Sequence, residues 1–288
     1  MPASSARRRA RQLARHGTVD RVEGTTPALV CPLVLAQAAE IEALPAGHFL
    51  TDPTKLANGL RALHGAFGTD VIVTAVADDL AACSLAECAA GAAGTAGDPV
   101  AAVTGHPRVA AAVEATRRLA ATAEDAALAA ALCGPAQLAA QLGRPPDPAA
   151  LEDCGAGLLA LAKAFLEAGA HLLLVVEDEP LSRAAAGGWR SAVTPLINVA
   201  RFRQAAAAVV LADPADAALA PRGAVVCLPP AAAGPGQGIA LEADPAAWPA
   251  STLRRAGVPL VTSLGPVRGG FAECRAAVGQ LIAALAEG

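Results

Sequence analysis

The stretch Ala126–Gly143, AALAAALCGPAQLAAQLG, carries the local pattern on which the fold prediction rests. It predicts a short buried strand at Ala127–Leu132, a sharp turn at Gly134–Pro135 and a helix that opens at Ala136. Proline is well tolerated in the first turn of a helix, because the N–H that it lacks would have no partner within the helix. The free N–H groups of that turn would lie at the carboxyl end of the strand, where they favour an anionic group. Such turns also occur without a ligand, so the stretch predicts a fold unit before it predicts a site.

Strands alternate with helices along most of the chain. DVIVTAV at Asp70–Val76 and HLLLVV at His171–Val176 are short apolar runs, typical of parallel strands that are buried on both faces. Asp52–Phe67 is predicted to be helical, since Asp52 or Thr51 can cap it, a proline lies in its first turn and Gly68 ends it. This alternation is typical of parallel α/β architecture. The other strands are expected at Ala28–Val34, Ala224–Leu228, Gly238–Leu241 and Val258–Ser263.

The strand count favours one barrel over two domains. About seven strands are expected, and no break in composition divides residues 17–288, which are predicted to form a single domain. Residues 1–16 are rich in arginine and are expected to form a basic, solvated N-terminal helix or tail. Pro195–Ala212 is predicted to be helical, although Val209 and Val210 are β-branched and leave that end ambiguous.

The composition argues against several classes of protein. Aromatic residues make up 2% of the chain and tyrosine is absent, so the stacking platforms of a single-strand nucleic-acid binder are lacking. The net charge of −4 argues against a polyanionic partner for the whole chain. The longest fully apolar run, Ala205–Ala212, is too short to span a bilayer. Seven scattered cysteines without a CxxC pair fit reduced thiols. We therefore expect a soluble, cytoplasmic protein with no nucleic-acid or membrane partner.

The carboxyl ends of the strands form the working face of a parallel barrel. Acidic residues gather there, because Asp78 and Asp79 follow one strand and Glu177, Asp178 and Glu179 follow another. Such carboxylates could exchange protons with a substrate or hold a cation, or they could cap the helices that follow. The catalytic candidates are Asp78 and Glu177, which lie nearest their strands. The candidates for substrate binding are Asp79, Gly134, Gln137, Asp178 and Ser263.

Two cysteines are the candidates for a metal site. Cys133 and Cys227 end their strands and could converge on one ion. No histidine ends a strand, because His171 begins its strand and would face the opposite end of the barrel. Each cysteine is otherwise expected to be a small buried apolar residue. From the residues alone no cofactor is expected, and zinc would require these two thiols.

Four segments, in order, resemble the uroporphyrinogen decarboxylase superfamily, which also contains corrinoid-dependent methyltransferases. LCGPAQLAAQLG at Leu132–Gly143 resembles its GP-x-T/S-L-A turn and helix, and GTVDRVE at Gly17–Glu23 is similar to its vDR-x-P entry. Thr51–Val73 and Ala164–Ser182 are similar to two further segments, dPe-x-la…fg-x-D and aGAd…D. The resemblance implies a (β/α)8 TIM-barrel-like fold. The resemblance leaves open whether the last strand is lacking or degenerate, because the given sequence ends one helix after VTSLGP.

The resemblance implies a decarboxylase, a carboxy-lyase that acts on a tetrapyrrole or another acidic small molecule at the C-terminal face. Asp78 would match the family's strand-end aspartate, one residue out of register. The family's substrate-binding arginines have no counterpart in Pro32–Ala39, and its active-site tyrosine has none in the chain. Arg144, Arg183 or Arg190 would have to reach in from loops instead.

Two alternatives stay open beside decarboxylation. One is a zinc-, corrinoid- or thiol-dependent methyltransferase of the same superfamily, with Cys227, Cys133 and Glu177 as zinc ligands. The superfamily's His-x-Cys would fall on Val225-Val226-Cys227, where the histidine is lost. The other is a barrel that has lost catalysis and acts as a binding or partner subunit. For an enzyme the expected partner is a small acidic or tetrapyrrole-like molecule, and a homodimer is left open.

Overall fold

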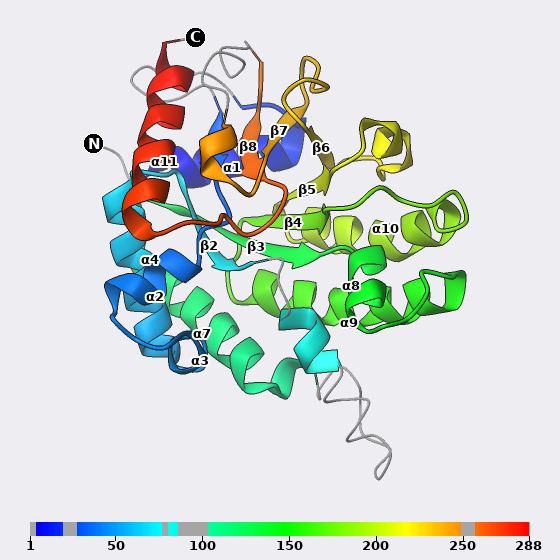
Figure 1. Ribbon diagram of the computed structural model, residues 1–288, viewed down its shortest axis with the longest axis horizontal. Coiled ribbons are helices and arrows are strands. Elements are labelled where there is room, and N and C mark those ends of the chain that lie inside the picture. Colours follow the sequence, from blue (N-terminus) through cyan, green and yellow to red (C-terminus); the bar gives the residue numbers. More distant parts are fainter. Residues whose placement is uncertain (1–3, 20–27, 77–79, 86–102, 249–256, 288) are drawn as a thin grey trace.

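Eight parallel strands form one sheet that curves into a nearly closed barrel, with helices around it (Figure 1). The structure is a computed structural model that describes residues 4–19, 28–76, 80–85, 103–248 and 257–287. The α/β, TIM-barrel-like prediction is therefore confirmed. The strand order is β1-β8-β7-β6-β5-β4-β3-β2. The strands are β1 (Leu29–Cys31), β2 (Val71–Ala75), β3 (Ala127–Cys133), β4 (Leu172–Glu177), β5 (Ala206–Leu211), β6 (Val225–Leu228), β7 (Gly238–Leu241) and β8 (Leu260–Ser263).

Helices cover the outside of the barrel, and their ends match the local signals in the sequence. Asp52 caps α4 by accepting the N–H groups of Thr54 and Lys55, and Gly68 ends that helix with a φ of 67°. In the described residues no helix is long and apolar enough to cross a bilayer. The helices are α1 (Ser4–His16), α2 (Ala36–Ile41), α3 (Ala46–Phe49), α4 (Pro53–Phe67), α7 (Pro107–Thr122), α8 (Pro135–Gln141), α9 (Pro148–Glu167), α10 (Ala186–Phe202) and α11 (Phe271–Ala286), with short 3-10 turns η1 (Pro214–Leu219) and η2 (Pro245–Ala247).

The strand that the sequence did not predict is β5. The helix expected over Pro195–Ala212 is wrong in its second half, because α10 ends at Phe202 and Ala206–Leu211 pairs with β4 on one side and β6 on the other. The run AAAVVL has no helical or alternating period, and alanine favours a helix when considered alone. Pairing with two neighbouring strands supplies the hydrogen bonds and burial that make it a strand instead. Pro195 lies inside α10 rather than in its first turn.

The irregular place in the barrel is the junction of β1 and β2, not the last strand. In the described residues β8 pairs with both β7 and β1, while β1 and β2 are the two ends of the strand order. Two side chains bridge this seam. The Asp70 carboxylate accepts the N–H of Val30 at 3.1 Å and a guanidinium N–H of Arg9 at 2.9 Å. Arg9 also donates to the carbonyl of Ala28 at 2.6 Å. The last strand, β8, is therefore present and paired on both sides.

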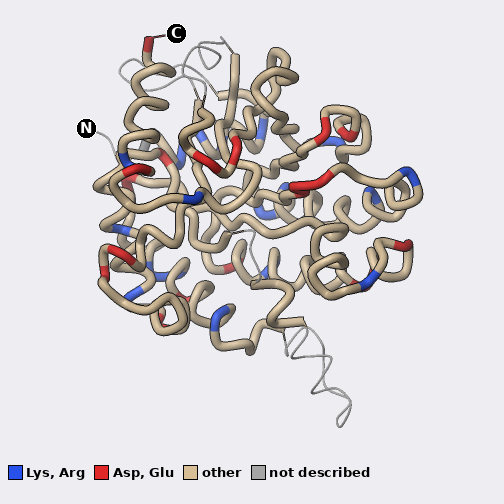
Figure 2. Tube along the Cα trace, viewed as in Figure 1, with Lys and Arg blue, Asp and Glu red and all other residues tan. Residues whose placement is uncertain are grey.

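The N-terminal helix α1 packs against the barrel. Ala6, Ala10 and Leu13 are buried, and the helix contacts β1, β3 and β5. Arg9 is fully buried in the seam. The helix is therefore solvated on one side only, which corrects the expectation of a solvated tail. The charged residues lie mainly on the helices and loops, and the strands are almost free of charged residues (Figure 2).

Candidate functional site

The direction of each strand side chain follows from two contacts and the strand register. Thr74 faces outward, because its hydroxyl accepts a hydrogen bond at 2.7 Å from Thr116 of α7. The adjacent Val73 therefore faces the barrel interior, as does its register partner Ala129 on β3. The ladder from β3 to β4 then places Val176 inward and Glu177 outward. The contact of Glu177 with Trp189 of α10 agrees with this assignment.

Three thiols line the interior near the carboxyl ends of the strands. Val176 pairs in register with Cys133 and with Val210, and Val210 pairs with Cys227. The same alternation brings Cys31 to the inner face through its partner Thr262. All three thiols are buried. Burial raises the pKa of Cys227 to about 12 and raises that of Cys31 further, so both are neutral thiols at pH 7.

Glu177 is the one charged residue in the eight strands that the structure describes, and it is bound by the protein itself. One carboxylate oxygen accepts the N–H of Ala136 at 2.9 Å and the indole N–H of Trp189 at 2.7 Å. The other accepts the N–H of Gln137 at 2.9 Å. The free N–H groups at the start of α8 therefore hold an anion, as the sequence suggested, but the anion is Glu177. Burial raises its pKa to about 7, against the opposite effect of these three donors.

Gly134 makes this arrangement possible. It lies before α8 with an extended backbone, and its N–H donates to the carbonyl of Val176 at 2.6 Å. A Cβ at this position would lie 2.1 Å from a carboxylate oxygen of Glu177. Only glycine therefore lets the β3–α8 turn approach the end of β4 so closely. Gly134 therefore leaves the space that the Glu177 carboxylate occupies.

The other candidates have different environments. Asp78 and Asp79 lie outside the described residues. Asp178 is exposed. Ser263 is buried, and its hydroxyl accepts the N–H of Leu33 and donates to the carbonyl of Gly265, which ties the end of β8 to the loop after β1.

The proposed zinc ligands do not come together. Cys133 and Cys227 face the interior, whereas both oxygens of Glu177 face outward and accept N–H groups. Within the described part of the chain, no group of three His, Cys, Asp or Glu residues could hold a metal ion. These residues therefore do not fit zinc.

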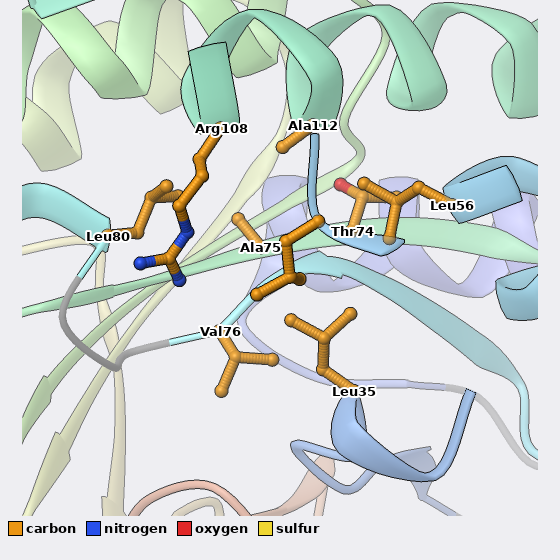
Figure 3. Close-up of a pocket in the computed structure, with 9 residues that line it drawn as sticks. Leu35, Leu56, Thr74, Ala75, Val76, Leu80, Arg108 and Ala112 are labelled. Carbon is orange, nitrogen blue, oxygen red and sulfur yellow. The ribbon is translucent and has the colours of Figure 1, made fainter. Parts of the chain in front are cut away.

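Arg108 is the arginine that lies beside the end of β2, and it is not one of the three expected from the sequence. Figure 3 shows its side chain extending from α7 past Leu80 and Ala75 toward the end of that strand. The cavity that it borders has a volume of about 10 Å³, room for about one water molecule. Arg108 lies in the first turn of α7, and nothing in the sequence tells which way its side chain points.

The three arginines expected to reach in from loops lie on the surface. Arg144 forms an ion pair with Asp153 at 2.8 Å, and Arg183 and Arg190 are exposed. None of the three borders the cavity beside Arg108. No cationic clamp is therefore formed by these residues.

Comparison with known proteins supports the fold. No protein family and no curated protein matches this chain. Among solved structures, it is similar to a methyltransferase from Methanosarcina mazei, with a TM-score of 0.66 and 13% identity over 98% of each chain. It is also similar to the apo form of the homocysteine methyltransferase MmuM from Escherichia coli, with a TM-score of 0.49 and 15% identity over 88% of this chain and 95% of that one. At 13% identity, the first similarity shows a shared fold.

Proposed function

We propose that this chain is a methyltransferase of the superfamily that its sequence resembles, working at the carboxyl end of the barrel. The observation that carries the proposal is the match to the methyltransferase from Methanosarcina mazei, which extends over 98% of both chains. It favours methyl transfer over the decarboxylation that the sequence resemblance placed first.

The charge distribution also favours methyl transfer over decarboxylation of a tetrapyrrole. A substrate with several carboxylates needs cationic groups to bind it. The described strands offer Glu177 as their only charged residue, and it faces away from the interior. Arg144 is paired on the surface with Asp153. The described interior therefore suits an uncharged group better than a polycarboxylate.

The protein's part in such a reaction is to position two small molecules and exclude water. In methyl transfer, one bond to the methyl carbon forms as the opposite one breaks, so donor and acceptor must be held in line. The inner face carries Cys31, Cys133 and Cys227 among alanine, valine and leucine side chains. Because the pKa values of Cys31 and Cys227 are raised, we assign these thiols to the lining of the inner face, and the acceptor thiol to a substrate.

The proposal is tested with the purified full chain, methylcobalamin as donor and homocysteine as acceptor. We expect S-methylated homocysteine, measured by mass spectrometry, to form in proportion to enzyme. Cys227→Ala should lower the rate about tenfold by removing a side chain from the inner face against which the methyl group is aligned. Cys274→Ala is the matched control, because Cys274 is buried on α11, outside the inner face.

A parallel anaerobic incubation with uroporphyrinogen separates the alternatives. Loss of its carboxylates, without methyl transfer, would replace the proposal with the decarboxylase reading. No product from either incubation would favour the binding-subunit reading. Equal rates for Cys227→Ala and Cys274→Ala would place the reaction away from the barrel interior.

A further inference from the structure

A second and much larger hollow lies at the opposite, N-terminal end of the barrel. Its volume is about 390 Å³, which is in the range of small-molecule sites. It lies between α1, the turn from α9 into β4 and the turn from α10 into β5. We call it the basal cleft. Its polar lining consists of Arg11, Arg15, His171, Arg203 and Gln204.

Helix α1 carries two kinds of arginine. Arg7 donates to the carbonyls of Ala120, Ala123 and Ala126, and buried Arg9 bridges the seam. Arg11 and Arg15 are exposed and border the basal cleft, and within the described residues they form no ion pair or side-chain hydrogen bond. Their spacing of four residues puts them on one face of the helix. Arg7 and Arg9 are therefore structural, whereas Arg11 and Arg15 are available to a ligand.

The nearby helix ends do not need these arginines. At the end of α9, the N–H of Ala170 bonds to the carbonyl of Phe165 and that of Gly169 to Leu166. At the end of α10, the N–H of Ala205 bonds to Ala200 and that of Gln204 to Arg201. The backbone itself thus satisfies carbonyls that a basic side chain often caps. Capping does not account for the positions of Arg11 and Arg15.

His171 adds a neutral donor to the cleft. Its Nδ1 accepts the N–H of Leu128 at 3.1 Å, so the proton of the neutral ring lies on Nε2. Burial lowers the pKa of His171 to about 4, with further lowering by Arg7 and Arg11. The ring is therefore neutral at pH 7, and its tautomer is fixed by β3.

One carboxylate at the rim of the basal cleft would compete with a bound anion for Arg203. Glu167, at the end of α9, accepts a guanidinium N–H of Arg203 at 2.5 Å. This pair is exposed on both sides, so its contribution to stability is small. Arg203 can therefore exchange Glu167 for a stronger anion, or bind both through its several N–H donors.

We propose that the basal cleft binds a small polyanion with two or more phosphate groups, held by Arg11, Arg15 and Arg203 and oriented by His171. Guanidinium groups bind phosphate oxygens through paired N–H donors, which favours phosphate over a single carboxylate. The volume admits a small molecule and not a folded partner. The site is at the opposite end of the barrel from the proposed methyl-transfer site and does not depend on that function.

Isothermal titration calorimetry with inorganic pyrophosphate, at constant ionic strength, tests the proposal on the full chain. We expect the double variant Arg11→Gln/Arg15→Gln to bind about a hundredfold more weakly, since the charge-assisted hydrogen bonds lost with each arginine are worth about tenfold in Kd. Arg8→Gln is the matched control, because Arg8 is an exposed arginine of the same helix outside the cleft. It should change the Kd by less than about twofold.

Further titrations define the ligand class. Citrate at the same ionic strength should bind more weakly than pyrophosphate if paired phosphate contacts hold the ligand. Equal affinity for citrate would change the class to polycarboxylates. The proposal is overturned if pyrophosphate does not bind at about 1 mM, or if the double variant and Arg8→Gln bind alike. Both outcomes are independent of methyl-transfer activity.

Discussion

The two ends of β4 differ in whether the protein itself binds the polar and charged groups that lie there. At the carboxyl end, Glu177 is buried and its carboxylate accepts three N–H groups from the protein. At the amino end, His171 borders a cleft where Arg11 and Arg15 have no ion-pair partner in the described residues. In the sequence, both ends are ionisable residues beside a strand. The difference lies in whether the protein supplies the counter-charge, and only an unsatisfied group points to a ligand.

The largest expected effect on stability comes from adding a methyl group in the space that the Glu177 carboxylate occupies. Gly134→Ala would put a methyl group 2.1 Å from the carboxylate oxygen, so the turn or Glu177 must move. We expect the free energy of unfolding to fall by about 3 kcal/mol, the upper part of the range for overpacked sites. Urea denaturation at pH 7 measures it.

The control is Gly279→Ala on α11, where a Cβ meets nothing within 4 Å. Alanine is the better helix former, so this change should stabilise the protein by up to about 1 kcal/mol. If Gly134→Ala is as stable as the wild type, Glu177 is not held in the position described, and the contrast between the ends of β4 fails.

The two ends should also give opposite pH dependences of stability. The pKa of Glu177 is raised from 4.5 to about 7, so the folded protein binds its proton more tightly and stability falls as pH rises through that interval. The pKa of His171 is lowered from 6.5 to about 4, so stability falls as pH decreases through that interval. In the wild type the two slopes oppose each other.

When either Glu177 or His171 is replaced, the pH dependence of stability that remains should be that of the other residue. Glu177→Gln removes the loss at high pH, so its stability relative to wild type should rise by about 2 kcal/mol between pH 4.5 and 7. His171→Asn should change relative stability in the other direction between pH 6.5 and 4. Denaturation midpoints with constant m-values measure both. Parallel pH profiles for the two variants would contradict the assignment.

Much of the fold could be predicted because its signals are local. The cap at Asp52, the left-handed Gly68 and the strand–Gly-Pro–helix turn depend on residues a few positions apart. β5 could not be predicted in this way, because alanine and valine alone do not distinguish a strand from a helix and its neighbours in the sheet decide. The seam between β1 and β2 depends on Arg9, which is 61 residues from Asp70 in the chain.

The candidate site was less predictable, because the sequence shows which residues end a strand but not to which side of the sheet their side chains point. Glu177 ends its strand as expected, yet one residue of register turns it from the interior to α8 and α10. The zinc interpretation needed Cys133, Cys227 and Glu177 on one side of the sheet, which the register excludes for Glu177. Arg11 and Arg15 gave no signal of their own, since the partners of Arg7 and Arg9 are distant in sequence.

A smaller effect should distinguish a hydrogen bond to a charged group from one to a neutral group. Trp189→Phe removes the indole donor to Glu177, whereas Trp248→Phe removes a donor to the carbonyl of Glu242. Because Glu177 ionises near pH 7, the loss of stability for Trp189→Phe should be about 1 kcal/mol greater at pH 8 than at pH 5. The cost of the smaller ring is the same at both pH values. Trp248→Phe should show no such difference. An equal loss of stability for Trp189→Phe at pH 5 and pH 8 would mean that Glu177 has the same charge at both pH values.

The smallest expected effect is at the amino end of β4 and separates the two roles of His171. In His171→Asn, the amide oxygen can replace Nδ1 as acceptor for the N–H of Leu128, while the Nε2 donor is lost. The stability at pH 7 should change by less than about 1 kcal/mol, and pyrophosphate binding should weaken about threefold, the effect of one neutral hydrogen bond. His171→Leu loses the acceptor as well, so it should also destabilise the protein by about 1 to 3 kcal/mol. If His171→Asn binds like the wild type while Arg11→Gln/Arg15→Gln binds weakly, His171 only supports β3 and the arginines alone hold the anion.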